Sequence, residues 1–203
     1  MKLFKLAACL LAAALAGCAH PLTITPNLAK LERDGMTPPR IKAKVGYYIA
    51  DNLRSQEVTT PGGGGDKATS APYRDVEAGL YIMLGNVFDG VTRLNSPSDR
   101  DAIRSNGISY IITPEILASS SSSSVLTWPP TEFHIDLLCK ITDLDGKLLD
   151  SPKVVGHGQA EWAEFKGDFA LSGKRAAEDA LVQMQRKLLA ERLAPQAPQT
   201  AAQ

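Results

Sequence analysis

Alternate positions of residues 131–142 carry apolar side chains, which is the pattern of a β-strand with one buried face. The inward-facing set is Phe133, Ile135, Leu137, Cys139 and Ile141. A second apolar strand is predicted over residues 108–116, and the tetrapeptide Asp143-Leu144-Asp145-Gly146 turns the chain back into returning strands at 147–149 and 153–162. Pairing of the first two strands would give a long hairpin with one apolar face.

Apolar residues at helical spacing elsewhere in the chain predict helices that can cover the apolar face of this hairpin. The expected helices, with the residues that begin or end them, are 75–94 (capped by Asp75), 98–105 (capped by Ser98 and ended by Gly107 in the left-handed conformation) and one that begins near Ser172. With a first strand over 41–52, the order of elements predicts a single α+β domain over residues 41–192. Its two main helices would pack on a mostly antiparallel sheet.

The first eighteen residues indicate where the protein is located. Lys2 and Lys5 precede an uncharged apolar run, which has the length of a signal-peptide core and is too short to span a bilayer. The run ends in Leu15-Ala16-Gly17-Cys18, which resembles the lipobox of bacterial lipoproteins, in which the cysteine is acylated and the preceding segment is removed. We therefore expect a signal peptide over 1–17 and lipidation of Cys18. The alternative is an ordinary signal peptide that happens to contain a cysteine.

Several acyl chains on one residue give stable membrane anchoring. Ala19, rather than Asp, follows the cysteine, and by resemblance to the sorting rule of enterobacterial lipoproteins this favours the outer membrane, with the domain facing the periplasm. Four prolines and little periodicity predict that residues 18–40 are a flexible tether. Residues 193–203, rich in Pro, Gln and Ala, are expected to be a disordered tail.

Composition excludes some functions. The 22 basic and 22 acidic residues of the 203-residue chain cancel, so no basic face for nucleic acid is expected. Hydrophobic residues make up 44% of the chain and aromatic residues 6%, which suits one domain with a mainly aliphatic core. After removal of residues 1–17 and lipidation of Cys18, Cys139 is the remaining thiol. No intramolecular disulfide is then possible, and its place in the alternating pattern predicts a buried structural cysteine.

No motif predicts a catalytic, cofactor or metal site. The run Gly62–Gly65 with Lys67 fails the phosphate-loop pattern and is interpreted as a flexible surface loop. Asp143 and Asp145 lack the further ligands of a calcium loop. His20, His134 and His157 are too scattered in sequence to suggest a metal site. Spatially assembled Ser-His-Asp catalysis stays open, although the usual motifs around a nucleophilic serine are missing.

Residues 119–130 are the candidate partner-binding segment. Six serines, two prolines and the apolar Leu126 and Trp128 would form the tip of the long hairpin. Because an exposed tryptophan is unfavourable unless it meets a partner or a membrane, we take Ser119, Leu126, Trp128 and Pro129 as candidate contact residues. The alternative is that Trp128 folds back and caps the edge of the sheet. Trp162 is expected on the returning strand at the edge of the core.

Residues 102–116 run from a helix through Gly107 into Ser109-Tyr110 and the apolar strand. This run resembles the domain shared by TolB amino-terminal regions, LpoB-type activators of penicillin-binding proteins and the curli secretion lipoprotein CsgG. The order of elements over roughly 41–192 is also similar. The resemblance implies an interaction module without catalytic residues.

Three functions follow as hypotheses. The leading one is a non-enzymatic, lipid-anchored periplasmic module that binds a protein of the cell envelope. The alternative is a lipoprotein that binds a small apolar or lipid ligand in envelope transport. The third is a cell-wall hydrolase, which would need an acid or a nucleophile in a cleft. The sequence does not identify the partner or the oligomeric state.

Overall fold

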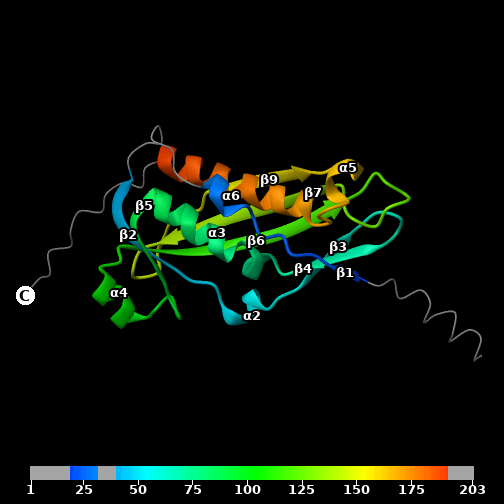
Figure 1. Ribbon diagram of the computed structural model, residues 1–203. Coiled ribbons are helices and arrows are strands. Elements are labelled where there is room, and N and C mark those ends of the chain that lie inside the picture. The colour runs from blue at the N-terminus through cyan, green and yellow to red at the C-terminus, as the bar shows by residue number, and fades with distance from the viewer. Residues whose placement is uncertain (1–18, 32–39, 192–203) are drawn as a thin grey trace, which may run out of the picture.

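Two sheets and a layer of helices form the protein, whose computed structural model describes residues 19–31 and 40–191 (Figure 1). The strands of the described residues are β1 (Ala19–Pro21), β2 (Ile41–Tyr47), β3 (Val58–Pro61), β4 (Lys67–Ser70), β5 (Phe88–Arg93), β6 (Tyr110–Ser121), β7 (Glu132–Thr142), β8 (Leu148–Asp150) and β9 (Lys153–Gln159). The helices are the 3-10 turn η1 (Leu28–Leu31), α2 (Asp51–Arg54), α3 (Pro72–Val87), α4 (Arg100–Asn106), α5 (Trp162–Phe165) and α6 (Leu171–Glu191). None of these helices is long and apolar enough to cross a bilayer.

The larger sheet has the order β5-β2-β6-β7, and both β8 and β9 pair with the far edge of β7. β5 and β6 run parallel to β2, whereas β6, β7 and β9 are antiparallel. The predicted long hairpin is present, with β6 and β7 paired from Ile111 and Thr142 to Ser121 and Glu132. The structure is the single α+β domain predicted, with a mixed sheet that is antiparallel from β6 onward.

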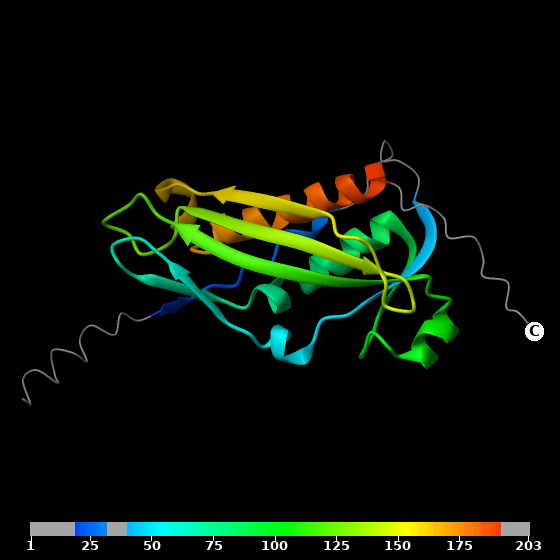
Figure 2. The same cartoon turned by 180° about the vertical axis from the view of Figure 1, so that it is seen from behind.

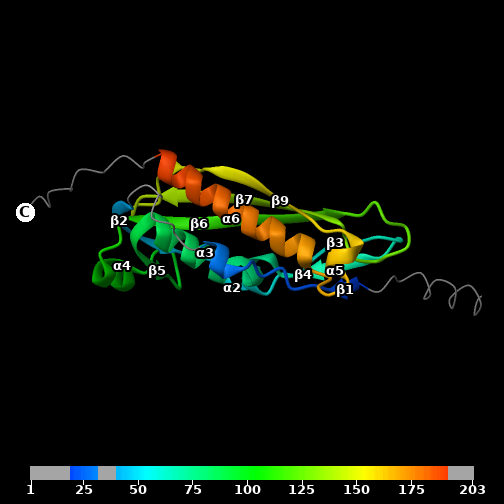
Figure 3. The same cartoon turned by 45° about the horizontal axis from the view of Figure 1, so that its top comes forward.

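The hydrophobic core lies between one face of this sheet and the helices α3 and α6 (Figure 3). The alternating side chains of β7 that were predicted to point inward are all buried there. So is the small-residue stripe of α6, which includes Ala176, Ala177 and Ala180. Because the facing positions of β9 are Gly156 and Gly158, the backbones of helix and strand come into direct contact.

The helix predicted over 75–94 is shorter, because α3 ends at Val87 and residues 88–93 form β5. The apolar spacing continues through these residues, but the β-branched Val91 and Thr92 favour an extended strand, and pairing with β2 satisfies the backbone groups there. Asp75 is not the cap of α3 but lies buried in its first turn, where its carboxylate accepts a hydrogen bond from the Ile24 backbone N–H (3.1 Å).

The amino-terminal segment also differs from the prediction. Residues 19–31, expected to be part of a flexible tether, pack on the domain: β1 pairs with β4, and Ile24 and Leu31 are fully buried between α3 and α6. The apolar residues of this segment have little periodicity because each fills a separate gap in the core. The predicted signal peptide (1–17), Cys18 and the tail (193–203) lie outside the described residues.

Most of the turns and helix ends lie where the sequence predicts them. Gly107 ends α4 with φ of 63°, as predicted, and Asp99 rather than Ser98 caps that helix. Asp143 closes the β7–β8 turn by accepting hydrogen bonds from the backbone N–H groups of Asp145 and Lys147. Trp162, predicted on the returning strand, instead begins α5 and is 60% exposed.

Candidate functional site

One end of the domain gathers most of the segment that was predicted to bind a partner. Four elements meet there: β1, the turn 62–66, the loop 122–131 and the junction of α5 with α6 (right in Figure 1). We call this the aromatic end because Trp128, Trp162 and Phe169 lie on it. The candidate residue Cys18 immediately precedes β1 in the sequence and lies outside the described residues.

Trp128 folds back on the domain, as the alternative interpretation proposed. Its ring stacks on His20 (centroids 4.1 Å apart) and is tilted against Phe169 (5.1 Å). It also packs on a small cluster of Leu22, Ala68 and Ala170. The tryptophan therefore holds the loop to β1 and to the start of α6.

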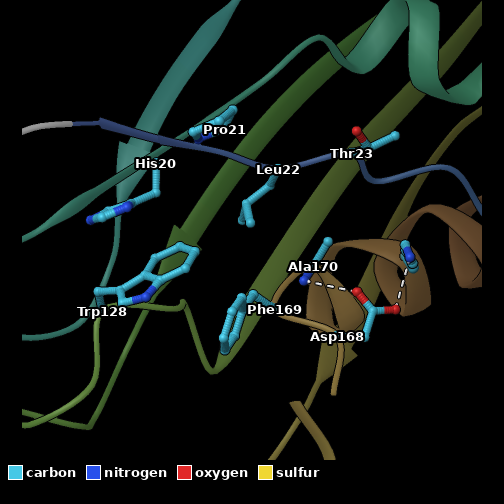
Figure 4. A pocket seen from close by; sticks show the side chains of 9 residues that line it. His20, Pro21, Leu22, Thr23, Trp128, Asp168, Phe169 and Ala170 are labelled. Carbon is cyan, nitrogen blue, oxygen red and sulfur yellow. Dashed lines mark hydrogen bonds and ion pairs between the residues drawn. The ribbon is translucent and has the colours of Figure 1, made fainter. Parts of the chain in front are cut away.

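A shallow hollow of about 320 Å³ lies beside Trp128 (Figure 4). Its apolar wall includes Leu22 and Phe169, and its polar rim includes Asp168 and Lys174, which form an ion pair (2.8 Å). The Asp168 carboxylate also accepts a hydrogen bond from the Ala170 backbone N–H (3.1 Å). The charges on the rim are therefore already satisfied within the protein.

The glycine turn 62–66, interpreted from the sequence as a flexible surface loop, instead supports the loop 122–131. The backbone N–H groups of Gly63 and Gly64 donate to the carbonyl oxygens of Trp128 (2.8 Å) and Ser124 (3.2 Å). A Cβ atom at Gly63 would overlap the Thr127 carbonyl oxygen. Glycine is thus required because two backbones approach closely, which no sequence pattern in either segment indicates.

The serines of the loop also have specific partners. The Ser124 hydroxyl accepts hydrogen bonds from the Leu126 and Thr127 backbone N–H groups and from the Thr127 hydroxyl (2.7 Å). Ser120 is buried at the end of β6, where its hydroxyl donates to Thr60 of β3 (2.7 Å). The loop is therefore ordered by its own side chains.

Only part of the predicted contact set is accessible. Leu126 is 91% exposed at the tip of the loop and its neighbour Val125 is 81% exposed. Trp128 is half-buried and Pro129 is buried, so neither offers a free surface. Ser119 is exposed, but it lies on the sheet opposite His134 rather than at the tip.

A second surface is the face of the hairpin that points away from α3 and α6. In the part of the chain that the structure describes, α3 and α6 lie behind β6, β7 and β9, and no helix covers the opposite side of these strands (Figure 2). Leu117 of β6 stands 69% exposed there, in one cross-strand row with Asp136 and Val155. Leu138 is half-buried in the adjacent row. We call this the open face.

Polar groups surround the apolar residues of the open face. Glu115 pairs with Lys140, and Asp136 pairs with Lys153 (3.2 Å). Next to Ser119, His134 and His157 lie directly opposite each other, with their Nδ1 atoms 2.7 Å apart. The two histidines are 23 residues apart in the sequence, so no local motif joins them. Their contact follows from the register of β7 against β9, which depends on the tertiary structure.

Elsewhere, the groups that could carry chemistry have structural partners. On α3, Glu77 accepts hydrogen bonds from Arg54 (2.9 Å) and from the Tyr47 hydroxyl (3.2 Å). Burial, together with the charge of Glu77, raises the pKa of Tyr47 to about 12. Cys139 is fully buried as predicted, and this burial raises the pKa of its thiol to about 12. No group of three or more His, Cys, Asp or Glu side chains in the described residues could hold a metal ion.

No family model matches the chain, and no curated protein matches its sequence. Similar solved structures include a protein of the DUF330 family model from Xanthomonas campestris (TM-score 0.43, 15% identity, covering 86% of this chain and 92% of that chain). They also include the PelC dodecamer from Paraburkholderia phytofirmans (0.42, 12%, 79% and 96%) and a minor lipoprotein from Acinetobacter baumannii (0.40, 13%, 76% and 98%). Similarities this weak do not assign a function. None of the three is named as a TolB, LpoB or CsgG domain, so that resemblance stays a prediction.

Proposed function

We propose that this protein is a non-enzymatic lipoprotein, anchored through Cys18 to the periplasmic side of the outer membrane, whose domain binds another protein of the cell envelope. The lipobox sequence supports the anchor. The exposed Leu117 on the open face, in one row with Val155, is the observation that supports protein binding, because burial of a large exposed aliphatic side chain by a partner is favourable.

The composition of the open face suits a protein partner. Leu117 and Val155 flank Asp136 in one cross-strand row, and Leu138 lies between Glu115 and Lys153 in the next, so apolar side chains alternate with the Glu115–Lys140 and Asp136–Lys153 ion pairs. Interfaces between soluble domains combine apolar contacts with polar groups and hydrogen bonds in this way. This surface takes the place of the hairpin tip as the proposed protein contact, and of the predicted residues it includes Ser119.

The absence of catalysis is part of the proposal, and the site chemistry supports it. The Cys139 thiol is protonated in the core, and the Glu77 carboxylate forms an ion pair with the Arg54 guanidinium. The two histidines of the open face contact each other at an exposed position on β7 and β9. A nucleophile or a general acid needs a shielded position close to a bound substrate.

A photo-crosslinking residue at position 117 tests the interaction in living cells. We expect one envelope protein to be captured at this position and its capture to fall at least several-fold in a Val155→Lys background, because a charge would then replace one of the few apolar side chains of the open face. The matched control is crosslinking at Tyr81, which is 49% exposed on α3 and lies away from the open face.

Absence of capture at position 117 in a chain that accumulates normally would contradict the proposal. Capture of the same protein at positions 117 and 81 alike would also contradict it, because the contact would then not be specific to the open face.

The hollow beside Trp128 favours the alternative of a small apolar or lipid ligand. A lipid seen by native mass spectrometry, with no protein captured, would support that alternative.

A further inference from the structure

We propose that the aromatic end of the domain rests directly on the lipid bilayer, with Val125 and Leu126 in contact with the acyl chains and Trp162 and Phe169 at the level of the headgroups. This inference rests on the lipidation of Cys18 proposed above. It goes beyond the proposed protein interaction, because it concerns a different surface and a different partner.

The first argument is the position of the anchor. Cys18 is joined to Ala19, the first residue of β1, and Ala19 pairs with Lys67 of β4. Leu22 and Ile24 are buried immediately afterwards. Because consecutive Cα atoms are about 3.8 Å apart, acyl chains on Cys18 begin within a few ångströms of the folded domain. An anchor without a linker holds the aromatic end at the membrane surface.

The second argument is the chemistry of this end. It presents four large hydrophobic side chains to solvent: Val125 (81% exposed), Leu126 (91%), Trp162 (60%) and Phe169 (44%). Burial of such a side chain in an apolar environment is favourable. Aromatic side chains, tryptophan above all, favour the boundary between headgroups and acyl chains. Aliphatic residues at a loop tip with aromatic residues behind them match the depth profile of that boundary.

The third argument is that the loop cannot easily bury these residues against its own domain. Its base is fixed by the hydrogen bonds from Gly63 and Gly64 and by the packing of Trp128 on His20. The Ser124 hydroxyl fixes the turn that carries Leu126. A loop that is ordered and still directs Leu126 outward favours an external apolar partner.

The fourth argument is charge. Residues 119–130 contain no charged side chain, so insertion of the tip desolvates no ion. Two carboxylates nearby are paired, Asp168 with Lys174 (2.8 Å) and Glu164 with Arg175 (2.7 Å). The Arg175 guanidinium, with the Glu161 backbone N–H, lowers the pKa of Glu164 to about 2.

The test uses the full mature lipoprotein in vesicles of phosphatidylethanolamine and phosphatidylglycerol. An environment-sensitive fluorophore is attached through Leu126→Cys, or through the matched control Ser105→Cys on α4 at the opposite end of the molecule. Cys139 is buried and protonated, so each introduced thiol is labelled selectively. We expect the probe at position 126 to shift to shorter wavelength and to be quenched several-fold more by brominated lipids than the probe at position 105. A Val125→Asp change should reduce that difference.

Equal, water-like signals at both positions, in protein whose Cys18 is shown by mass spectrometry to carry lipid, would overturn the docking and leave the anchor intact. Protein without lipid at Cys18 would overturn the anchor and the docking together. A photo-crosslinker at position 126 that captures one protein in cells, rather than lipid, would also overturn the docking and assign the tip to a protein partner.

Discussion

At the residue scale, the glycines of the turn 62–66 are needed for two different reasons. Gly64 and Gly65 adopt φ values of 65° and 88°, which side chains with a Cβ rarely adopt. Gly63 has an ordinary backbone conformation, but it leaves room for the Thr127 carbonyl oxygen. The sequence shows the glycines and suggests flexibility, whereas the structure uses them to bring two loops together.

We predict that Gly63→Ala lowers the free energy of unfolding by about 1–3 kcal/mol, because one of the two backbones must move to admit the methyl group. Denaturant unfolding measures this loss. The matched control is Gly167→Ala, where a Cβ meets no atom within 4 Å, so its stability should stay within about 0.5 kcal/mol of the parent. Equal stability of the two variants would show that the loops are not held together at Gly63.

At the element scale, apolar periodicity found the main helices α3 and α6 and the strands β2, β6, β7 and β9, but it missed β1, β3, β4 and β5 and some element ends. Residues 75–94 keep one apolar stripe throughout, although the chain changes from α3 to β5 at Phe88. The difference arises because β5 has a strand to pair with, and a partner that distant in sequence has no local signature. The strands of the β6–β7 hairpin were predictable, since their apolar runs are local features, and the tetrapeptide 143–146 likewise predicted the turn from β7 to β8.

Pro114 shows the same dependence on neighbours. A proline inside a central strand removes one donor from the ladder. It is tolerated here because the pairing of β6 with β2 ends at Ile112, and beyond it the Ile116 backbone N–H donates to the Tyr73 hydroxyl (3.1 Å). Where β6 has no pairing with β2, a side chain of α3 therefore accepts one of the backbone hydrogen bonds of β6.

The contact between α6 and β9 gives a prediction at the same scale. A Cβ at Gly156 would overlap backbone atoms of Ala176 and Ala180, so Gly156→Ala should push helix and sheet apart and cost about 1–3 kcal/mol or more. Thermal unfolding measures the loss. Gly85→Ala, in α3 and with open space around it, is the control and should leave stability unchanged or raise it by up to about 1 kcal/mol. A Gly156→Ala variant as stable as the parent would contradict this packing.

At the scale of the whole molecule, the domain begins earlier than predicted. Residues 19–31 contribute Leu22, Ile24 and Leu31 to the buried set, and Asp75 and Asn86 hold their backbone through hydrogen bonds to Ile24 and Leu31. The segment therefore belongs to the core and also links the proposed lipid anchor to the fold.

We predict that a chain beginning at Ile41, the boundary expected from sequence, is much less stable than one beginning at Ala19. Each of the three buried side chains lost contributes about 1.5–3 kcal/mol, and their sum is comparable to the whole stability of a typical domain. Circular dichroism and urea unfolding of the two chains test this. A cooperative transition at the same urea concentration for both would show that residues 19–31 are dispensable.

Local patterns were sufficient to predict the α+β class, the long hairpin and the inward position of Cys139, because each depends on neighbouring residues or on a strand or helix period. The lipobox is a local pattern too, and it stays a prediction. The stacking of Trp128 on His20, the pairing of His134 with His157 and the support of the loop beneath Leu126 by the glycine turn were not predictable in this way. Those arrangements depend on strand register and on close contact between segments distant in sequence, and neither leaves a local pattern.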